Sequence, residues 1–436
     1  MWRKFKDNLL LRRLLTVLSL DVLVKASAFI LFPLYLRLMT QSEYGAFNYI
    51  LSIVYAFSVL LNLGLYIPQS KLYHDHADSQ TRGKLLYNIN LLLVVALLVI
   101  VLPVYLFGWD YRAVKLLFQN SVNYSRYRWL ILLMTLTALF SYMLTNFFYT
   151  AEKIDLIKKF NLLRVIGINV IGLLALYLIK KRDSLEVRFI AISVVELLLI
   201  LCFYGVYLKP MIRTVDRRII IKSLKMGLPI MLSTIFSIVI NYGDKFFLEK
   251  YAGYKQLSIY YLAFSFSSII SLISMSLQNV WLPLFFKEKD LQKNIAKTTK
   301  MIFRLTLGLI GLSVLILAGV AVFLWIGIIP RNYQEVLYLL PLLLISQILV
   351  CLAILYSNYL FYFEKTSLVL ASGLVISLVS TGLNMNLISR YGVYGAAFTI
   401  LVSNGLYLSI YYYFFRFYKK KHLLFPEKLP DPPINF

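Results

Sequence analysis

The chain has 436 residues, of which 60% are hydrophobic and 15% are charged, and its mean hydropathy is +0.75. A soluble domain does not need so apolar a sequence, whereas a membrane-spanning helix takes about 20 consecutive apolar residues. The net charge of +25 comes from basic loops beside apolar segments, which favours contact with anionic headgroups over nucleic-acid binding. We therefore predict an all-α polytopic membrane protein, with no nucleic acid among its partners.

Apolar segments of spanning length recur along the whole chain, and twelve of them can be drawn. The first six cover residues 14–39, 44–67, 85–109, 129–150, 157–179 and 189–208, and the second six cover residues 223–248, 257–282, 301–326, 336–363, 367–388 and 393–417. The connections between them are too short to hold a soluble domain. The predicted organisation is a basic N-terminus (1–13), an N-lobe of six helices (14–208), a basic linker (209–222), a C-lobe of six helices (223–418) and a tail (419–436).

The distribution of Lys and Arg sets the orientation. Most of the 45 basic residues lie in the termini and in loops on the same side as the termini. Short loops rich in Lys and Arg resist translocation, so the N-terminus, linker and tail are predicted to be cytoplasmic. The first apolar segment is long and lacks a small-residue cleavage site, which indicates a retained helix and not a removed signal peptide.

The two halves of the sequence resemble each other. Residues 32–71 and 243–287 both contain a helix, a short polar turn and a second helix, which we predict to end at Pro68 and at Pro283. The offset is about 212–215 residues, half the chain. Because each half contains an even number of helices, both enter the membrane in the same sense. Parallel repeats of this kind are typical of secondary transporters with a substrate cavity between the halves.

These hairpins also carry short motifs in a recognisable order. They are residues 225–229 (KMGLP), 241–248 (NYGDKFFL), 257–261 (LSIYY) and 280–283 (VWLP), with 33–37 (PLYLR), 43–45 (EYG) and 62–64 (NLG) in the first half. In this order they resemble the polysaccharide flippases of the O-antigen and capsule type, within the multidrug/oligosaccharidyl-lipid/polysaccharide exporter superfamily. The resemblance covers essentially the whole chain. It departs from the family at Lys245, where the family often has Arg.

The resemblance implies two six-helix lobes around a central cavity. It also implies a task, which is to move an undecaprenyl-diphosphate-linked oligosaccharide repeat unit across the bacterial inner membrane by alternating access, for surface polysaccharide synthesis. The expected partners are the lipid-linked oligosaccharide, membrane lipids, a polysaccharide polymerase with its chain-length machinery, and a proton or sodium gradient. No cofactor is expected.

Charged side chains inside apolar segments cost about 2.5–3.5 kcal/mol each on insertion scales, so each needs a reason. Asp21 and Lys25 share a face of the first helix. They form either a self-neutralising pair or a cavity-facing pair, in which Asp21 holds a coupling proton and Lys25 attracts phosphate or an acidic sugar. Arg164 either snorkels to the headgroups or binds a diphosphate with its planar fork. Glu196 is either the partner of Arg164 or Lys25, or a protonatable coupling site.

Asp244 and Lys245 are adjacent near the outer end of the seventh segment, and we expect them to point in different directions, either as anchors or towards the cavity. Amides suit sugar hydroxyls and are scattered over both halves. The candidate substrate-binding residues are Lys25, Arg164, Asn62, Asn241 and Gln278, and the candidate ion-coupling residues are Asp21, Glu196 and Asp244.

Enzyme motifs are missing from the sequence. There is no Gly-x-x-x-x-Gly-Lys-Ser/Thr loop, so ATP does not drive this chain directly. The cluster from His74 to Asp78 lies in a polar loop, so no metal site is predicted, and the three His cannot build a Ser/His/Asp set. We interpret the chain as a transporter without catalytic residues. The alternatives are a cation-coupled multidrug exporter of the same superfamily, a membrane glycosyltransferase or polymerase, and a scaffold for a synthase complex.

Overall fold

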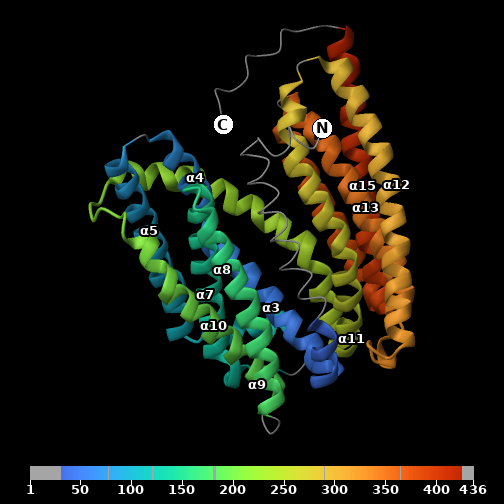
Figure 1. The fold of residues 1–436 in the computed structure, drawn as a ribbon, viewed down its shortest axis with the longest axis horizontal. Coiled ribbons are helices and arrows are strands. Elements are labelled where there is room, and N and C mark those ends of the chain that lie inside the picture. The colour runs from blue at the N-terminus through green and yellow to red at the C-terminus, as the bar shows by residue number, and fades with distance from the viewer. Residues whose placement is uncertain are drawn as a thin grey trace. The chain divides into compact units, whose positions relative to one another are not determined.

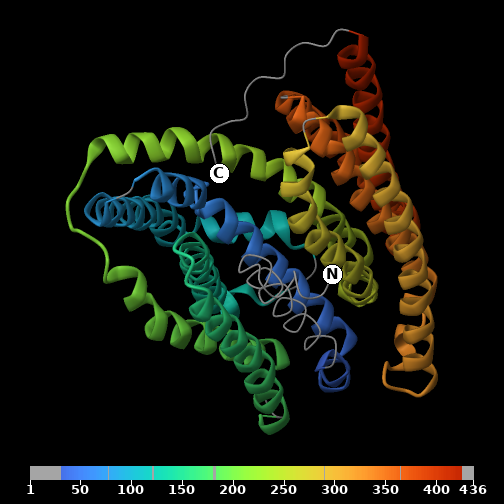
Figure 2. The ribbon, with the colours of Figure 1, turned by 45° about the horizontal axis from the view of Figure 1, so that its top comes forward.

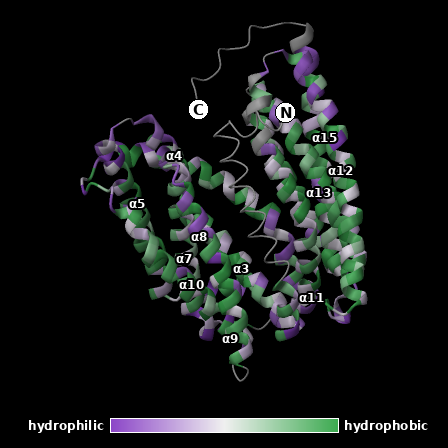
Figure 3. Ribbon diagram, viewed as in Figure 1, coloured by the Kyte–Doolittle hydropathy of each residue, from purple (hydrophilic) through white to green (hydrophobic). Residues whose placement is uncertain are grey.

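The computed structural model describes residues 31–76, 78–119, 122–179, 183–288, 290–363 and 365–424. Within these ranges the regular structure is entirely helical (Figure 1). In Figure 3, hydrophobic residues cover most of the helices, and hydrophilic residues gather at ends such as the junction of α4 and α5. A helix satisfies its backbone polar groups internally, which is what an apolar segment needs in lipid. The prediction of an all-α polytopic membrane protein is confirmed.

The chain divides into two compact units, Met1–Tyr261 with Phe323–Gln334, and Leu262–Val322 with Glu335–Phe436. The helices of the first unit are α3 (Gln41–Leu61), α4 (Tyr66–Asp75), α5 (Ser79–Leu106), α6 (Trp109–Leu117), α7 (Tyr124–Thr150), α8 (Ile154–Ile166), η1 (Gly167–Ile171), α9 (Gly172–Leu178), α10 (Ser184–Leu208), η2 (Arg331–Tyr333) and the first part of α11 (Arg217–Lys287). The second unit holds the rest of α11, most of α12 (Leu291–Trp325), α13 (Val336–Tyr362), α14 (Thr366–Leu383), η3 (Asn384–Ile388) and α15 (Ser389–Leu424). The boundary between the two units lies at Tyr261 and not in the predicted linker 209–222. The division into an N-lobe (14–208) and a C-lobe (223–418) therefore stays a prediction.

Nine helices of the described residues are long and apolar enough to cross a membrane. Two of them contain a residue with non-helical backbone angles, Gly253 (φ 74°) in α11 and Gly392 (φ 54°) in α15. A positive φ is accessible to Gly at little steric cost. Each of these two helices is long enough for two crossings, so the described residues account for eleven of the twelve predicted segments. The remaining segment, residues 14–39, lies mostly outside them.

The helix ends differ from the prediction at both prolines. The chain breaks after Leu61, at Leu63 (φ 54°) and Gly64 (φ 68°), and α4 then runs through Pro68. Pro68 is tolerated because it lies in the first turn of α4, where a backbone N–H has no intrahelical acceptor. In the second half, α11 continues beyond Pro283 to Lys287. The predicted helix ends at Pro68 and Pro283 are therefore wrong.

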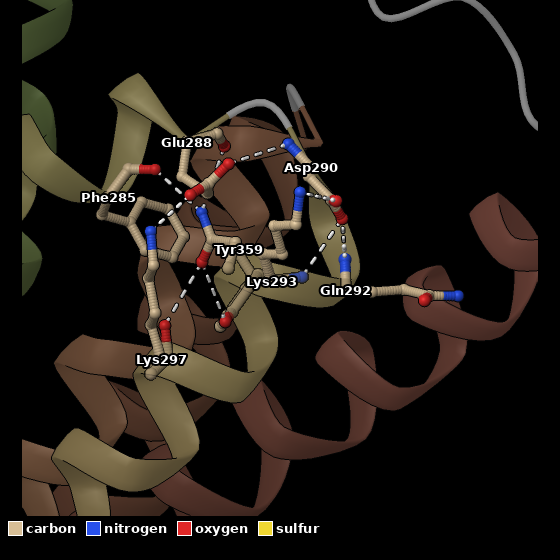
Figure 4. Close-up of polar contacts among 9 residues, drawn as sticks. Phe285, Glu288, Asp290, Gln292, Lys293, Lys297 and Tyr359 are labelled. Carbon is tan, nitrogen blue, oxygen red and sulfur yellow. Dashed lines mark hydrogen bonds and ion pairs between the residues drawn. The ribbon is translucent and has the colours of Figure 1, made fainter.

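Both units contain the same local contacts, at positions related by the offset between the two halves of the sequence. The helices α7 and α13 both have 27 residues and begin at Tyr124 and Val336. In the first unit the Arg82 side chain donates to the carbonyls of Tyr73 (3.0 Å) and His76 (2.7 Å). In the second unit Asn294 donates to the carbonyls of Phe285 (2.8 Å) and Glu288 (3.5 Å), in the cluster drawn in Figure 4. Asn294, Phe285 and Glu288 follow Arg82, Tyr73 and His76 by one and the same offset. The starts of α7 and α13 are separated by that offset too.

The aromatic cores follow the same register. Tyr73 meets Phe147 edge to face, with ring centroids 6.2 Å apart, and Phe285 meets Tyr359 in the same way at 4.9 Å. Each unit also has a π-helical turn, η1 in the first and η3 in the second. The helices α7, α8 and α10 lie together in one unit, and α12, α13 and α15 in the other, in both Figure 1 and Figure 2. An internal repeat therefore exists in three dimensions.

Candidate functional site

Among the described residues, buried charges occur only in the first unit. They are Asp110, Arg188, Glu196, Asp244, Lys245 and Glu249. The buried polar residues of the second unit are all uncharged, being Ser, Thr, Asn and Gln. Ionisable groups at membrane depth are expensive and are typical of substrate or ion pathways. The first unit therefore holds the candidate site.

The centre of this candidate site is an ion pair between α8 and α10. Both Nε and Nη2 of Arg164 lie 2.5 Å from Oε1 of Glu196, and the Ser141 hydroxyl donates to Oε2 at 2.7 Å. The Glu196 side chain is 3% exposed, whereas the Arg164 side chain is 27% exposed. The sequence left Arg164 and Lys25 as possible partners of Glu196, and the structure pairs Glu196 with Arg164. One edge of the guanidinium is occupied, and the side chain still reaches the surface of the unit.

A second buried cation, Arg188, was missed by sequence reasoning because it lies one residue before the predicted start of the sixth segment. Its Nη1 donates to the Tyr35 hydroxyl (2.7 Å) and to the carbonyl of Ile168 (3.2 Å). Its guanidinium carbon lies 4.1 Å from the ring centroid of Tyr35 and 4.8 Å from that of Phe47. Tyr35 in turn donates to the carbonyl of Asn169 (2.8 Å).

The π-helical turn explains how Arg188 is held. The carbonyls of Ile168 and Asn169 lie in η1, where the wider turn disrupts the normal α-helical bonding. Cation–π contacts and carbonyl dipoles replace a counter-ion, since no carboxylate of the described residues pairs with Arg188. Its Nε is buried without a partner there. Within the described part of the chain, Arg188 is thus a buried cation held without a carboxylate.

Asp244 and Lys245 contact each other, so the prediction that they point in different directions is wrong. The Lys245 Nζ lies 3.0 Å from Oδ1 and 3.2 Å from Oδ2 of Asp244, and it also donates to the carbonyl of Asn241 (2.7 Å). The hydroxyl of Tyr260 donates to the same carboxylate. The four-carbon stem of Lys is flexible enough to fold back on its own helix. Both side chains are buried, which favours an internal role over interfacial anchoring.

Two further buried carboxylates, Glu249 and Asp110, bond residues that lie before and after residues 120–121. Glu249 is fully buried and accepts the backbone N–H of Gln119 at 3.1 and 3.0 Å, and it also accepts the Tyr254 hydroxyl at 3.1 Å. Asp110 pairs with the Nε of Arg128 at 2.5 Å. Sequence reasoning missed both because they lie at the edges of predicted apolar segments. Their bonds fix the ends of helices.

The predicted amide ligands are dispersed. Asn62 is buried and bridges the break after α3, donating to Met143 Sδ (2.7 Å) and accepting the Tyr66 N–H (3.2 Å). Asn241 is exposed, and its amide donates to the Ser237 carbonyl (2.8 Å). Gln278 belongs to the second unit. Asp21 and Lys25 lie outside the described residues. Of the predicted site residues, the structure therefore joins Arg164 to Glu196, and Asn241 to the Asp244–Lys245 pair.

Metal ligation has no support in the described part of the chain. It contains no group of three or more His, Cys, Asp or Glu side chains that could hold an ion.

Comparisons with known proteins give a family and a fold. The sequence profile of a family described as "Polysaccharide biosynthesis protein" matches residues 10–289. No significant match exists among curated protein sequences. The structure titled "Lipid II flippase MurJ, inward closed conformation" is similar with a TM-score of 0.69 and 15% identity, over 91% of this chain and 87% of that chain.

Multidrug resistance transporters of the MATE family, from the MOP superfamily, have the same fold. An inward-facing structure gives a TM-score of 0.59 and 12% identity, over 93% of this chain and 99% of that chain. An outward-facing structure gives a TM-score of 0.56 and 13% identity, over 95% of this chain and 94% of that chain. At these identities the likeness establishes the fold alone.

Proposed function

This chain belongs to the polysaccharide biosynthesis protein family, and from that membership we propose that it is a flippase for an undecaprenyl-diphosphate-linked oligosaccharide repeat unit. It is a multi-pass membrane transporter and not an enzyme. The repeat unit would cross the bacterial inner membrane by alternating access of the two six-helix lobes, for surface polysaccharide synthesis. Both termini would be cytoplasmic. A polymerase with its chain-length machinery would act on the product, and a proton or sodium gradient would drive the cycle.

The observation that carries this proposal is which of the buried charged side chains have an oppositely charged partner and which do not. Each buried carboxylate of the described residues has a cation or a hydrogen-bond donor, whereas Arg188 has no carboxylate. Arg164 is held in a fixed orientation by Glu196 and remains partly exposed. A planar guanidinium binds the oxygens of a diphosphate in the same bidentate way as it binds a carboxylate. The partly exposed guanidinium of Arg164 and the lack of a carboxylate at Arg188 among the described residues therefore favour an anionic headgroup.

Arg164 and Glu196 also give the cycle a route to ion coupling. In the proposal the diphosphate replaces Glu196 on Arg164. Glu196, whose side chain is 3% exposed, would then be the group that binds the coupling ion. Return of Arg164 to Glu196 would release both the diphosphate and the coupling ion. Asp244, with Lys245, is the second candidate coupling group.

Depletion in the native cell tests this proposal. We expect completed undecaprenyl-diphosphate-linked repeat units to accumulate on the cytoplasmic leaflet, and their sugars then identify the substrate. Lys25→Ala and Arg164→Ala should each abolish export while the protein still inserts. Full export by the double variant would refute the assignment of these residues.

A cation-coupled multidrug exporter is the second candidate, and the likeness to the MATE transporters favours it. A cavity for organic cations requires carboxylates that are free to bind them. If depletion leaves the lipid-linked sugars unchanged and raises sensitivity to organic cations, drug export is the function.

A further inference from the structure

The first turns of α12 carry a line of exposed cations. This helix contains four basic residues and no carboxylate. Spacings of four, three and four residues place all four on one face, and all four side chains are exposed. Basic loops are enough to orient a membrane helix, so their alignment on one face needs a further explanation. We call this set the basic face of α12, and it consists of Lys293, Lys297, Lys300 and Arg304.

The length of α12 sets the depth of its basic face. Its 35 residues correspond to about 52 Å of helix, whereas the hydrocarbon core of a bilayer is about 30 Å thick. The last residue, Trp325, is 86% exposed, and Trp is enriched where the membrane meets water. A span of about 20 residues counted back from Trp325 reaches the region of Arg304. The basic face therefore begins at the level of the headgroups and continues away from the hydrocarbon core.

Two of the four cations have counter-ions in the protein. Nζ of Lys293 lies 3.3 Å from Oδ2 of Asp290, and Lys297 pairs with Glu288 (Figure 4). The other two cations of the basic face belong to no ion pair among the described residues. They are also the two nearest the hydrocarbon core, and an anion from outside the protein can bind them.

In the first unit the equivalent face of α5 is covered by the chain itself. Asn88, the counterpart of Lys300, donates to the carbonyl of Thr214 and accepts the N–H of Asp216, both at 2.8 Å. A Cβ at Gly83 would lie 2.4 Å from the carbonyl oxygen of Pro210. The segment between α10 and α11 therefore packs directly on α5. The four counterparts of the basic face are buried or half-buried there, and they are Thr81, Leu85, Asn88 and Leu92.

The second half of the sequence lacks the groups that hold such a segment. Lys300 stands where the first unit has Asn88, and Ile295 stands where it has Gly83. The ammonium group of a lysine cannot accept a backbone N–H. Ile295 carries the Cβ that the close approach at Gly83 excludes. Exposed cations at positions that are uncharged and covered in the first unit therefore indicate an occupant of different chemistry, which is anionic.

We propose that the basic face of α12 binds the phosphate headgroup of an anionic phospholipid, with Lys300 and Arg304 as its main contacts. The acyl chains lie on exposed residues that continue this face into the membrane, Leu307 (56% exposed) and Leu315 (69% exposed). Cations followed by exposed apolar side chains on one line match a lipid, whereas a soluble acidic partner would use the cations alone. Each Lys or Arg near the headgroups enriches an anionic lipid by about fivefold. This inference goes beyond transport and does not depend on which molecule is transported.

Quenching of a fluorophore on contact measures which lipid lies at this position. A bimane is attached at Leu307→Cys in the full chain, after Cys202→Ser and Cys351→Ser have removed the two native thiols. The protein is reconstituted in phosphatidylcholine with a small amount of either phosphatidylglycerol or phosphatidylcholine that carries a nitroxide on its acyl chain. We expect phosphatidylglycerol to be enriched beside the bimane by about fivefold or more, and by less at high salt. Equal quenching by the two lipids would overturn the proposal.

The repeat supplies a matched control. Val95→Cys on α5 is the counterpart of Leu307→Cys, and Val95 is 46% exposed, but the preceding turns of its face carry no cation. We expect the two nitroxide lipids to quench a bimane equally there. A preference of the same size at both positions would reflect the net charge of the whole protein and would contradict a site on α12.

Charge variants separate the contacts within the basic face. Lys300→Gln combined with Arg304→Gln should abolish the preference at position 307, whereas Lys293→Gln should reduce it by less than about twofold, because its charge is already paired. An unchanged preference in the double variant would refute the assignment of these two residues. Stronger enrichment of nitroxide-labelled undecaprenyl diphosphate at the same amount would assign the face to that lipid and overturn the proposal. A preference that emerges only when residues 425–436 are deleted would show that the tail occupies the face, and it would overturn the proposal too.

Discussion

The same pair of neighbouring helices is built with ions in one unit and without them in the other. In the first unit α7 packs on α10, and Ser141 bonds Glu196, which pairs with Arg164. In the second unit α13 packs on α15, and Asn404 donates to the hydroxyl (2.7 Å) and the carbonyl (3.2 Å) of Ser346. Packing this helix pair therefore does not require charge. The ions of the first unit need another explanation, and binding an anionic headgroup supplies one.

Two glycines of the first unit lie against backbone, whereas the three glycines of α12 in the second unit do not. A Cβ at Gly45 would lie 1.9 Å from the carbonyl oxygen of Tyr254, and a Cβ at Gly227 would lie 2.5 Å from that of Leu63. In α12 of the second unit, Gly308, Gly311 and Gly319 have nothing within 4 Å of the same position. The first unit is thus packed backbone to backbone at these points, which fixes the elements around its charges.

The largest expected effect comes from removing one ion of the first unit. Arg164→Leu leaves Glu196, 3% exposed, without its cation, and breaking a buried pair costs about 3–5 kcal/mol. The partial exposure of Arg164 places the loss near the lower end of this range. Arg164→Leu combined with Glu196→Leu should restore the unfolding temperature, because neither charge is then stranded. We expect the double variant to be folded and inactive in export.

Thermal unfolding in detergent and export by cells separate these effects. If the double variant exports normally, the ion pair is only a packing device and the contrast between the units has no functional meaning.

The next effect is steric. Gly45→Ala should lower the free energy of unfolding by about 3 kcal/mol, because backbone and not a flexible side chain occupies the space. Gly311→Ala is the matched control in the second unit. It should be neutral or stabilise by up to about 1 kcal/mol through helix propensity. Unfolding temperatures and the fraction of monodisperse protein measure both, and equal behaviour of the two variants would contradict the packing described.

A smaller effect is expected at the neutral hydrogen bond between α13 and α15, which joins Ser346 and Asn404. Asn404→Leu preserves volume, and Ser346 keeps its bond to the Ile400 carbonyl (3.3 Å). We expect a loss below about 1.5 kcal/mol and export within about twofold of the parent. Glu196→Leu, the same change in the first unit, should abolish export. A strong export defect in Asn404→Leu would show that the second unit also handles the headgroup.

The smallest effect is expected at two equivalent helix caps. Asp78 caps α5, and Asp290, its counterpart in the second half of the repeat, caps α12. Hydrogen bonds from the backbone N–H groups of Thr81 and of Lys293 hold the pKa of Asp78 and of Asp290 below its ordinary value. Stabilisation of this kind is complete above the unfolded pKa of about 3.9 and is lost as the pH falls through the lowered value.

Asp78→Asn and Asp290→Asn should therefore each lower the unfolding temperature slightly, and by a constant amount between pH 5 and pH 8. Scans of unfolding temperature across this range measure it. A loss that varies strongly with pH in one variant only would show that the two caps are not equivalent.

The spanning helices were predictable because about 20 apolar residues suffice to define one. Prediction was poorest at helix ends, where polar first turns extend the helix beyond the apolar run, as α5 does by starting at Ser79 and α12 by starting at Leu291. Arg188 and Glu249 were missed because each lies just outside the boundary of a predicted apolar segment. The Arg164–Glu196 pair was anticipated as one of two alternatives. Neither π-helical turn has a signal in hydropathy, although Asn169 and Asn386 occupy the same position in η1 and η3.

One measurement tests the central claim most directly. Purified protein is reconstituted into vesicles that contain an undecaprenyl-diphosphate-linked oligosaccharide, and an impermeant sugar-modifying enzyme reports the fraction of lipid that reaches the outer leaflet. We predict near-complete modification with the parent protein. With the Arg164→Leu/Glu196→Leu double variant we predict about half, as in protein-free vesicles. Equal modification with the parent protein and without protein would contradict the flippase function.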